Sequence, residues 1–281
     1  MEEVVTGYGL IEGPVWDAAK GLYFSDVRDG GIHLVNRLDQ VSTVLAKRRG
    51  VGGIALHAEG GLVFGGRDIS WSGLDGGVGK VLLSGEAIPG AFGFNDLTTD
   101  AEGRIYVGSL AFRVFGGDEP KPGKLHRIDL DGSMTTVSDG VMLTNGLGFS
   151  PDGKRLYHSD TRSNCVRVYE VRAGGALSPF RVFVDFSDGA ADGLKVAADG
   201  SVWVADARGG RVAVFEPDGS HRQDIAVPLP MVTSLCFGGD HLKDLYVVTG
   251  SDHGPSHACG TVFRTRVEVP GNPHAACKVA I

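Results

Sequence analysis

The chain has 281 residues, of which 44 are glycine and only 12 are proline, and its formal net charge is −7. The frequent glycines indicate an ordered chain with many tight turns, and the absence of basic blocks excludes the charge pattern of a nucleic-acid-binding protein. The N-terminus lacks the features of a signal peptide, and no apolar run is long enough to span a bilayer. We therefore expect a soluble, cytoplasmic protein with neither a nucleic acid nor a membrane as its partner.

One pattern recurs six times along the chain: a short apolar run, a turn with Asp or Gly, and a second run rich in strand-forming residues. The middle residues of the second runs are spaced 40 to 51 residues apart, which is close to the length of a four-stranded propeller blade. In chain order the copies are GPVWDAAKGLYFSD (13–26), GGIALHAEGGLVFGG (52–66), NDLTTDAEGRIYVGS (95–109), NGLGFSPDGKRLYHSD (145–160), DGLKVAADGSVWVAD (192–206) and TSLCFGGDHLKDLYVVTG (233–250).

Alternating segments between the copies, such as GKLHRIDLDGSMTTV (123–137), supply further strands. Asp-Gly pairs such as Asp131-Gly132 are typical of turns that join neighbouring strands. We therefore predict an all-β, six-bladed β-propeller in which residues 1–281 form a single domain. Because an open sheet edge must be sealed, we expect the run around Val4–Thr6 to pair with the last blade, GTVFRTRVEV (260–269).

The residues that begin the first strand of each repeat share one register. In a propeller this strand lines the central channel, so equivalent positions of different blades meet near the axis. Four of the six carry a carboxylate or amide oxygen, which are the ligands that hard divalent cations prefer. Asn145-Gly146 or Asp192-Gly193 alone is typical of a turn, but four such residues in one register favour a metal site. The six residues are Glu12, Gly52, Asn95, Asn145, Asp192 and Ser234.

Five segments resemble the SMP-30/gluconolactonase/luciferin-regenerating-enzyme family: EGPVW (12–16), FND (94–96), NGLGFSPDGKRLYHSD (145–160), ADGLKVAADGSVWVAD (191–206) and TSLCFGGDHLKDLYV (233–247). The resemblance implies that Glu12, Asn145 and Asp192 bind one divalent ion, which could be Ca, Mg, Mn, Fe(II) or Zn. It also implies that Asn95 is a ligand or a substrate contact, that Asp192 is the general base, and that the substrate is a small lactone.

The chain departs from this family at two positions that contact substrate hydroxyls. Members that resemble sugar lactonases carry an arginine two residues before the asparagine that matches Asn95, and a glutamate in the loop after the next strand. Here these positions are Gly93 and Arg113. The wall segment AFRVFGG (111–117) is apolar and cationic, so we predict that Phe112 and Arg113 contact a lactone that is less hydroxylated, aromatic or carboxylated, with a solvated loop charge as the alternative for Arg113.

The predicted reaction is metal-dependent hydrolysis of a lactone ring, with Asp192 accepting a proton from the attacking water. No GxSxG elbow supports a serine hydrolase. Two alternatives stay open: hydrolysis of a phosphotriester by the same groups, and a non-catalytic propeller whose cation is structural and whose surface is an interaction scaffold. We expect a monomer or a weak homo-oligomer.

Several other residues have less specific interpretations. The loop SDHGPSHACG (251–260) places His253 and His257 where they could reach the channel mouth or simply lie on the surface. We expect GGVGK (76–80) to be a turn and not a phosphate loop. Turn capping is the expected role of three acids that end second strands: Asp26, Asp160 and Asp206.

The four cysteines form no CxxC pair and have no histidine at zinc-finger spacing. Because free cysteine behaves as a small apolar residue, we expect reduced, packed thiols, with a disulfide as the alternative. The residues are Cys165, Cys236, Cys259 and Cys277.

Overall fold

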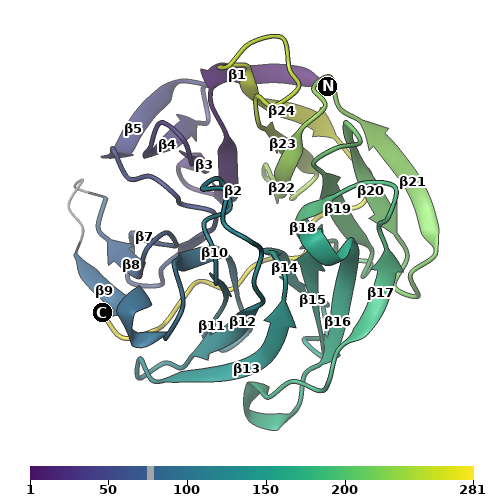
Figure 1. Cartoon of the computed structure of the whole chain (residues 1–281). Coiled ribbons are helices and arrows are strands. Elements are labelled where there is room, and N and C mark those ends of the chain that lie inside the picture. The colour runs from purple at the N-terminus through teal and green to yellow at the C-terminus, as the bar shows by residue number, and fades with distance from the viewer. Residues whose placement is uncertain (75–78) are drawn as a thin grey trace.

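The computed structural model describes residues 1–74 and 79–281, and regular structure in them is almost entirely β-strand (Figure 1). GGVGK, expected to be a turn, lies largely outside these residues. Three short 3-10 turns cover Gly85–Ala87, Thr161–Ser163 and Ala173–Gly175. The strands are β1 (Glu2–Tyr8), β2 (Ile11–Asp17), β3 (Gly21–Asp26), β4 (Gly31–Asn36), β5 (Val41–Ala46), β6 (Ile54–Leu56), β7 (Leu62–Phe64), β8 (Ile69–Ser72), β9 (Lys80–Leu83), β10 (Gly93–Thr99), β11 (Ile105–Leu110), β12 (Gly123–Ile128), β13 (Met134–Val141), β14 (Thr144–Phe149), β15 (Arg155–Asp160), β16 (Cys165–Glu170), β17 (Arg181–Asp185), β18 (Ala191–Val196), β19 (Val202–Asp206), β20 (Arg211–Phe215), β21 (His221–Ala226), β22 (Val232–Gly238), β23 (Asp244–Thr249) and β24 (Gly260–Arg266).

The strands form six four-stranded antiparallel sheets arranged as the blades of a propeller, which confirms the predicted fold (Figure 1). Five blades are consecutive: β2–β5, β6–β9, β10–β13, β14–β17 and β18–β21. The sixth combines β22, β23 and β24 with β1, so the first strand of the chain completes the last blade. No helix in the described part of the chain is long and apolar enough to cross a membrane.

Strand β1 seals the ring by pairing antiparallel with β24, as predicted. Val5 lies opposite Val262 and Thr6 lies opposite Thr261. The Thr261 hydroxyl donates to the Thr6 hydroxyl at 2.7 Å. The edge of β24 is therefore covered, and the two ends of the circle are joined by backbone pairing.

Apolar side chains of neighbouring blades pack against each other and form most of the core. For example, Leu194 and Val196 of β18 share a buried cluster with Tyr157 and Val166 of the preceding blade. The aligned residue in the middle of each second strand is buried, from Tyr23 in β3 onwards. All four cysteines are buried and free, which confirms the expectation of reduced, packed thiols.

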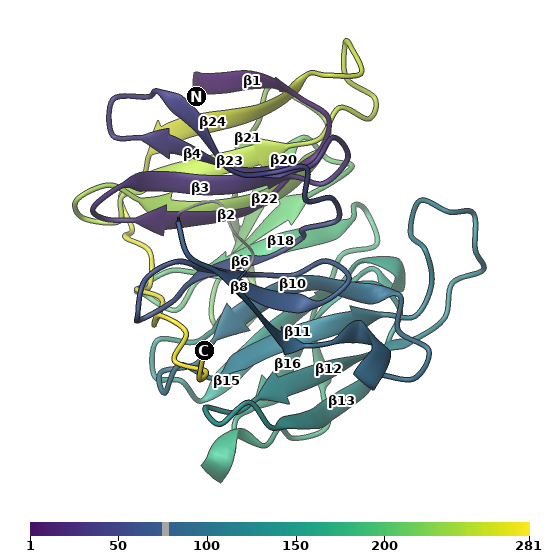
Figure 2. The ribbon, with the colours of Figure 1, turned by 90° about the vertical axis from the view of Figure 1, so that its left-hand side faces the viewer.

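The last residues of the chain cross the end of the axial channel that lies opposite the long loops (Figure 2). The Asn272 backbone N–H donates to the Val196 carbonyl at 3.1 Å, and the Cys277 N–H donates to the Leu56 carbonyl at 2.8 Å. Between them, the Thr99 hydroxyl donates to the Ala275 carbonyl. This tail, residues 267–281, therefore connects the ends of three inner strands.

Candidate active site

The innermost strands carry β-bulges at the four positions predicted to meet at the axis. In β10 the pairing with β11 shifts between Phe94 and Leu97, which leaves Asn95 and Asp96 without opposite partners. The same shift occurs after Glu12 in β2, at Asn145 in β14 and at Asp192 in β18. Because a bulge bends its strand and redirects side chains, the repeated bulges turn these polar groups toward a common point.

Glycine next to these residues lets the inner strands approach one another. A Cβ on Gly146 would lie 2.1 Å from the Leu194 backbone nitrogen and 2.7 Å from the Asp192 carbonyl oxygen. A Cβ on Gly52, the equivalent position in the second blade, would lie 2.0 Å from the Asn95 Oδ1. These glycines therefore leave space that the polar side chains of neighbouring blades occupy.

Buried aspartates fix the chain immediately before three of the candidate ligands. Asp206 pairs with Ala191 across the strands, and its Oδ1 accepts from the N–H groups of Ala190 at 3.0 Å and Gly209 at 2.9 Å. The Asp26 carboxylate accepts in the same way from the N–H groups of Gly9 and Asp29. The Asp160 carboxylate accepts from the N–H groups of Leu143 and Ser163. The expected turn capping is confirmed, and each of these carboxylates also accepts from a backbone N–H two or three residues before a candidate ligand.

All six predicted site residues line one cavity of about 400 Å³ at the mouth of the channel. Four of them come from four different blades, so their meeting depends on the closed ring. His253 also lines this cavity, whereas His257 is not among its described lining residues. The six are Glu12, Asn95, Phe112, Arg113, Asn145 and Asp192.

A chain of hydrogen bonds sets the orientation of the two amides. Asn95 Nδ2 donates to Asn145 Oδ1 at 2.5 Å and to the Thr144 carbonyl at 2.7 Å. Asn145 Nδ2 donates to the Thr161 hydroxyl at 2.7 Å, and that hydroxyl donates to the Ala191 carbonyl at 2.6 Å. Both amide nitrogens are therefore engaged with the protein, which orients the side-chain oxygens as electron-pair donors; Asn145 Oδ1 uses one of its two lone pairs for Asn95 and keeps the other.

The carboxylates of Glu12 and Asp192 are buried at the inner end of the cavity, and the one hydrogen bond that either accepts within the described residues comes from the Gly13 N–H to Glu12 Oε2 at 3.3 Å. Burial raises the pKa of Glu12 well above its usual range, and the charges of Asp192 and Asp96 raise it further. Burial also raises the pKa of Asp192 well above its usual range, with Asp96 adding to the shift. The positive charge of Lys195 only partly opposes the shift at Glu12. Negative charge at this point is therefore costly unless a cation balances it.

The donor set fits a hard divalent cation. Two carboxylates and two amides offer oxygen ligands only, which suits Ca²⁺, Mg²⁺ or Mn²⁺ by chemical type. Within residues 1–74 and 79–281 no group of three His, Cys, Asp or Glu side chains is placed to hold a metal ion by itself. The amide oxygens of Asn95 and Asn145 are the neutral side-chain donors that the cavity offers beside the carboxylates of Glu12 and Asp192.

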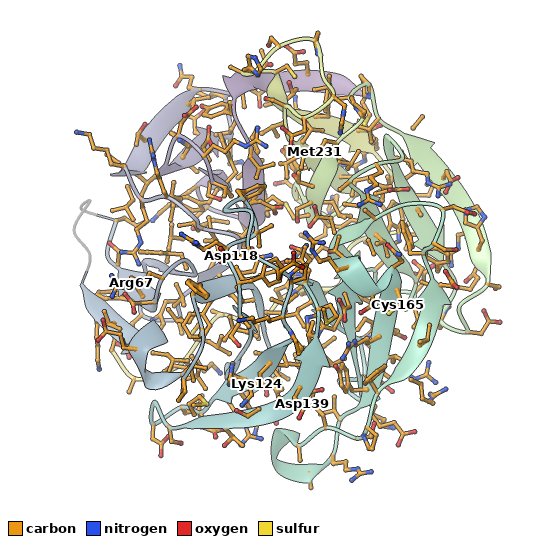
Figure 3. All side chains as sticks on the ribbon, viewed as in Figure 1. Arg67, Asp118, Lys124, Asp139, Cys165 and Met231 are labelled. Atoms are coloured by element: carbon orange, nitrogen blue, oxygen red, sulfur yellow. The ribbon has the colours of Figure 1, made fainter. Side chains whose placement is uncertain are left out.

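The loop after β11 forms one wall of the cavity and overhangs its mouth; Figure 3, which looks down the axis, shows Asp118 near the centre of the ring. Phe112 is buried in this loop, and the Arg162 guanidinium lies 5.4 Å from its ring centroid. Arg113 lies at the mouth, but its Nη2 is 2.6 Å from Asp118 Oδ1 and its Nε is 3.0 Å from Oδ2. This pair lowers the pKa of Asp118 to about 2, so the charge of Arg113 is already compensated within its own loop.

Three residues that the sequence did not single out also belong to the site. Asp96 is buried and its charge acts on both candidate acidic ligands. Thr161 orients Asn145, and Arg208 lines the cavity. The adjacency of Asp96 to Asn95 was the one available signal, while Thr161 and Arg208 lie in turns whose path the repeat pattern does not define.

A six-bladed propeller with acidic and amide oxygens converging in an axial cavity is the architecture of a small-molecule site, and comparison with known proteins defines it further. The chain belongs to the SMP-30/gluconolactonase/LRE-like family, whose region matches residues 10–251. A pentonolactonase of Haloferax volcanii is 31% identical over 290 residues, covering 96% of this chain and 95% of that protein. A 6-deoxy-6-sulfogluconolactonase of Pseudomonas putida is 31% identical, covering 93% and 92%. A solved luciferin-regenerating enzyme shares the fold, with a TM-score of 0.89, 24% identity, and coverage of 99% and 98%.

Proposed function

We propose that this protein is a divalent-metal-dependent lactonase. The observation that carries the proposal is the meeting of Glu12, Asn95, Asn145 and Asp192 in one cavity of a chain whose relatives include lactonases. Glu12, Asn145 and Asp192 would hold the ion, with Asn95 beside it as a further ligand or a substrate contact. When bound, the ion would supply Lewis-acid polarisation of the lactone carbonyl.

Asp192 is the group proposed to move the proton. Its carboxylate accepts a proton from the attacking water as the new carbon–oxygen bond forms at the carbonyl carbon. The ring carbon–oxygen bond then breaks, and the proton returns to the leaving alkoxide, which gives a hydroxy acid. Because water is itself the attacking group, no covalent intermediate with the protein is required.

The substrate is proposed to be less hydroxylated than a simple sugar lactone. A Cβ on Gly93 would lie 2.6 Å from the Gly66 carbonyl oxygen, so the arginine that contacts hydroxyls in sugar-lactonase relatives has no room here. Most of the wall is apolar, including Phe112, Leu143 and Met231. Such a surface binds aromatic or aliphatic parts of a ligand better than a polyol.

The proposal is tested with metal-free protein supplied separately with Ca²⁺, Mg²⁺, Mn²⁺, Zn²⁺ and, without oxygen, Fe²⁺. Ring opening of glucono-δ-lactone, γ-valerolactone and dihydrocoumarin is followed by acid release with a pH indicator. We expect turnover that requires a metal and a higher kcat/KM for the two less hydroxylated lactones. Intact lactones under every condition would contradict the lactonase proposal, and a preference for glucono-δ-lactone would contradict only the proposed substrate class.

Thr161 provides a prediction about the metal site that does not depend on turnover. In Thr161→Val the side chain keeps its shape but loses the hydroxyl that holds Asn145, whereas Thr161→Ser retains it. Because residues that orient ligands contribute to metal affinity, we expect about 10- to 100-fold weaker divalent-ion binding by calorimetry in the valine variant. Binding close to that of the wild type is expected for the serine variant, and equal affinities of all three proteins would contradict this role.

A further inference from the structure

The charged groups at the cavity mouth differ in whether another protein group neutralises them. Arg113 pairs with Asp118, as described above. Asp252, which also lines the cavity, receives two hydrogen bonds of 2.7 Å from Arg28 Nη2. The charges of Arg113 and Asp252 are therefore each balanced by an opposite charge of the protein, so neither residue offers a full charge to a ligand.

Arg208 is a cavity-lining cation for which no such partner exists in the described part of the chain. It lies in the turn after β19, is exposed, and its backbone N–H donates to Asp206 Oδ1 at 3.1 Å. The adjacent Asp206 carboxylate is taken by other groups, including Arg211 Nε at 3.0 Å. No ion pair or hydrogen bond of the Arg208 guanidinium occurs among residues 1–74 and 79–281, which leaves its donors available.

The cavity thus has three chemically distinct parts. The acids and amides lie at its inner end, where the ring carbonyl is proposed to react. Its walls are formed mainly by Leu10, Leu110, Phe112, Leu143 and Met231, and Arg208 lies at the rim. A matching ligand would have a polar reacting ring, an apolar connecting part and an anion at the far end.

We propose that Arg208 binds a carboxylate of the substrate, and that the substrate class is a lactone with an apolar side chain that ends in a carboxylate. This inference rests on the proposed lactonase function and makes its substrate class specific. A guanidinium matches the planar, two-oxygen geometry of a carboxylate and can bond both oxygens at once. Hydrolysis of such a lactone yields a dicarboxylate. The new carboxylate forms at the inner end of the cavity, where the acidic side chains would repel it and favour its release.

The experiment compares pairs of γ-lactones whose side chains increase in length from pair to pair. Within each pair the two side chains have the same length, and one ends in a methyl group while the other ends in a carboxylate. Steady-state rates are measured for the wild type, Arg208→Gln, Arg208→Lys and the matched control Arg181→Gln. Arg181 lies exposed on the outermost strand β17 and its replacement changes the net charge equally.

We expect Arg208→Gln to lower kcat/KM for the best carboxylate-ended lactone about 10- to 100-fold, mainly through KM, because a charge-assisted hydrogen bond is lost. Rates with its methyl-ended partner should change less than about 3-fold, Arg208→Lys should retain part of the preference, and Arg181→Gln should match the wild type. Equal losses for both lactones, or no loss, would overturn the role of Arg208 and leave the lactonase proposal standing. Hydrolysis of neither γ-lactone by a wild type that opens glucono-δ-lactone would overturn only the substrate class proposed here, whereas failure on all three kinds of lactone would overturn the lactonase proposal as well.

Discussion

Replacing Asp192 by asparagine is expected to lower lactone turnover by about 1000-fold or more while the protein stays folded. The substitution keeps the size of the side chain but removes the proposed proton acceptor and one of the two proposed anionic ligands. Loss of a general base alone typically costs 100- to 10,000-fold in rate. Turnover measured by acid release, together with circular dichroism, checks this result.

The same variant is expected to be more stable than the wild type when a chelator removes metal ions at neutral pH. The pKa of Asp192 and the pKa of Glu12 are raised in the folded protein, chiefly by burial and in part by neighbouring carboxylates. A raised folded pKa means that stability is highest below the unfolded pKa, about 4, and falls as pH rises through the folded value. Asparagine removes one of these charges, so the advantage of the variant should grow from pH 4 to pH 8.

Metal should reverse that order of stability. The wild type should gain about 2.7 kcal/mol when the free ion is present at 100 times its dissociation constant, whereas the variant should gain much less. Thermal unfolding with and without each ion measures both quantities. A variant that turns over lactones at the wild-type rate would contradict the role of Asp192, and a variant without any stability gain at neutral pH would contradict the charge argument.

Deleting residues 2–8, which form β1, is expected to destabilise the fold by more than about 4 kcal/mol. The deletion leaves β24 with an unpaired edge and removes apolar contacts of Val4, Val5 and Tyr8 with the last interface between blades. The ring of Tyr8 alone packs edge-on against Phe24 with centroids 5.0 Å apart. Full burial of an apolar side chain of this size contributes about 1.5–3 kcal/mol. Val4, Val5 and Tyr8 are half-buried and contribute less each, but the lost backbone pairing of β1 with β24 adds to the cost. A typical domain has only about 5–15 kcal/mol of total stability.

Removal of Met1 alone is the matched control, since that residue precedes the strand. We expect the control to unfold at the wild-type temperature and the longer deletion to unfold at a much lower temperature or to aggregate through its open edge. An unchanged unfolding temperature after loss of the whole strand would show that pairing of β1 with β24 contributes little to ring closure.

The sequence predicts the blades well because the signals are local and repeated. Alternating strands, Asp-Gly turns and the buried residues from Tyr23 to Tyr246 recur at a regular spacing, and the structure confirms six blades from these features. Convergence at the axis follows from symmetry alone. The shared register therefore predicts Glu12, Asn145 and Asp192 as neighbours, and they line one cavity although they are far apart in the chain.

Side-chain partners within the site depend on details that the repeat pattern lacks. In a regular strand Asn95 and Asp96 would point to opposite faces, so the repeat register places only Asn95 in the channel. The bulge between Phe94 and Leu97 breaks this rule and leaves both near the acids. Similarly, the pairing of Arg113 with Asp118 depends on the path of a long loop, which alternation and turn signals do not define.

The tail formed by residues 267–281 affects the route by which small molecules reach and leave the cavity. The tail lies across one end of the central hole and is bonded there to Val196, Thr99 and Leu56, whereas the cavity with the candidate ligands lies at the opposite mouth, which is therefore the expected route for small molecules. If the protein opens lactones as proposed, the acid product would have to leave through that same opening before another substrate molecule could enter. Release of the proposed doubly charged acid past Arg208 would therefore determine how strongly accumulated product inhibits turnover.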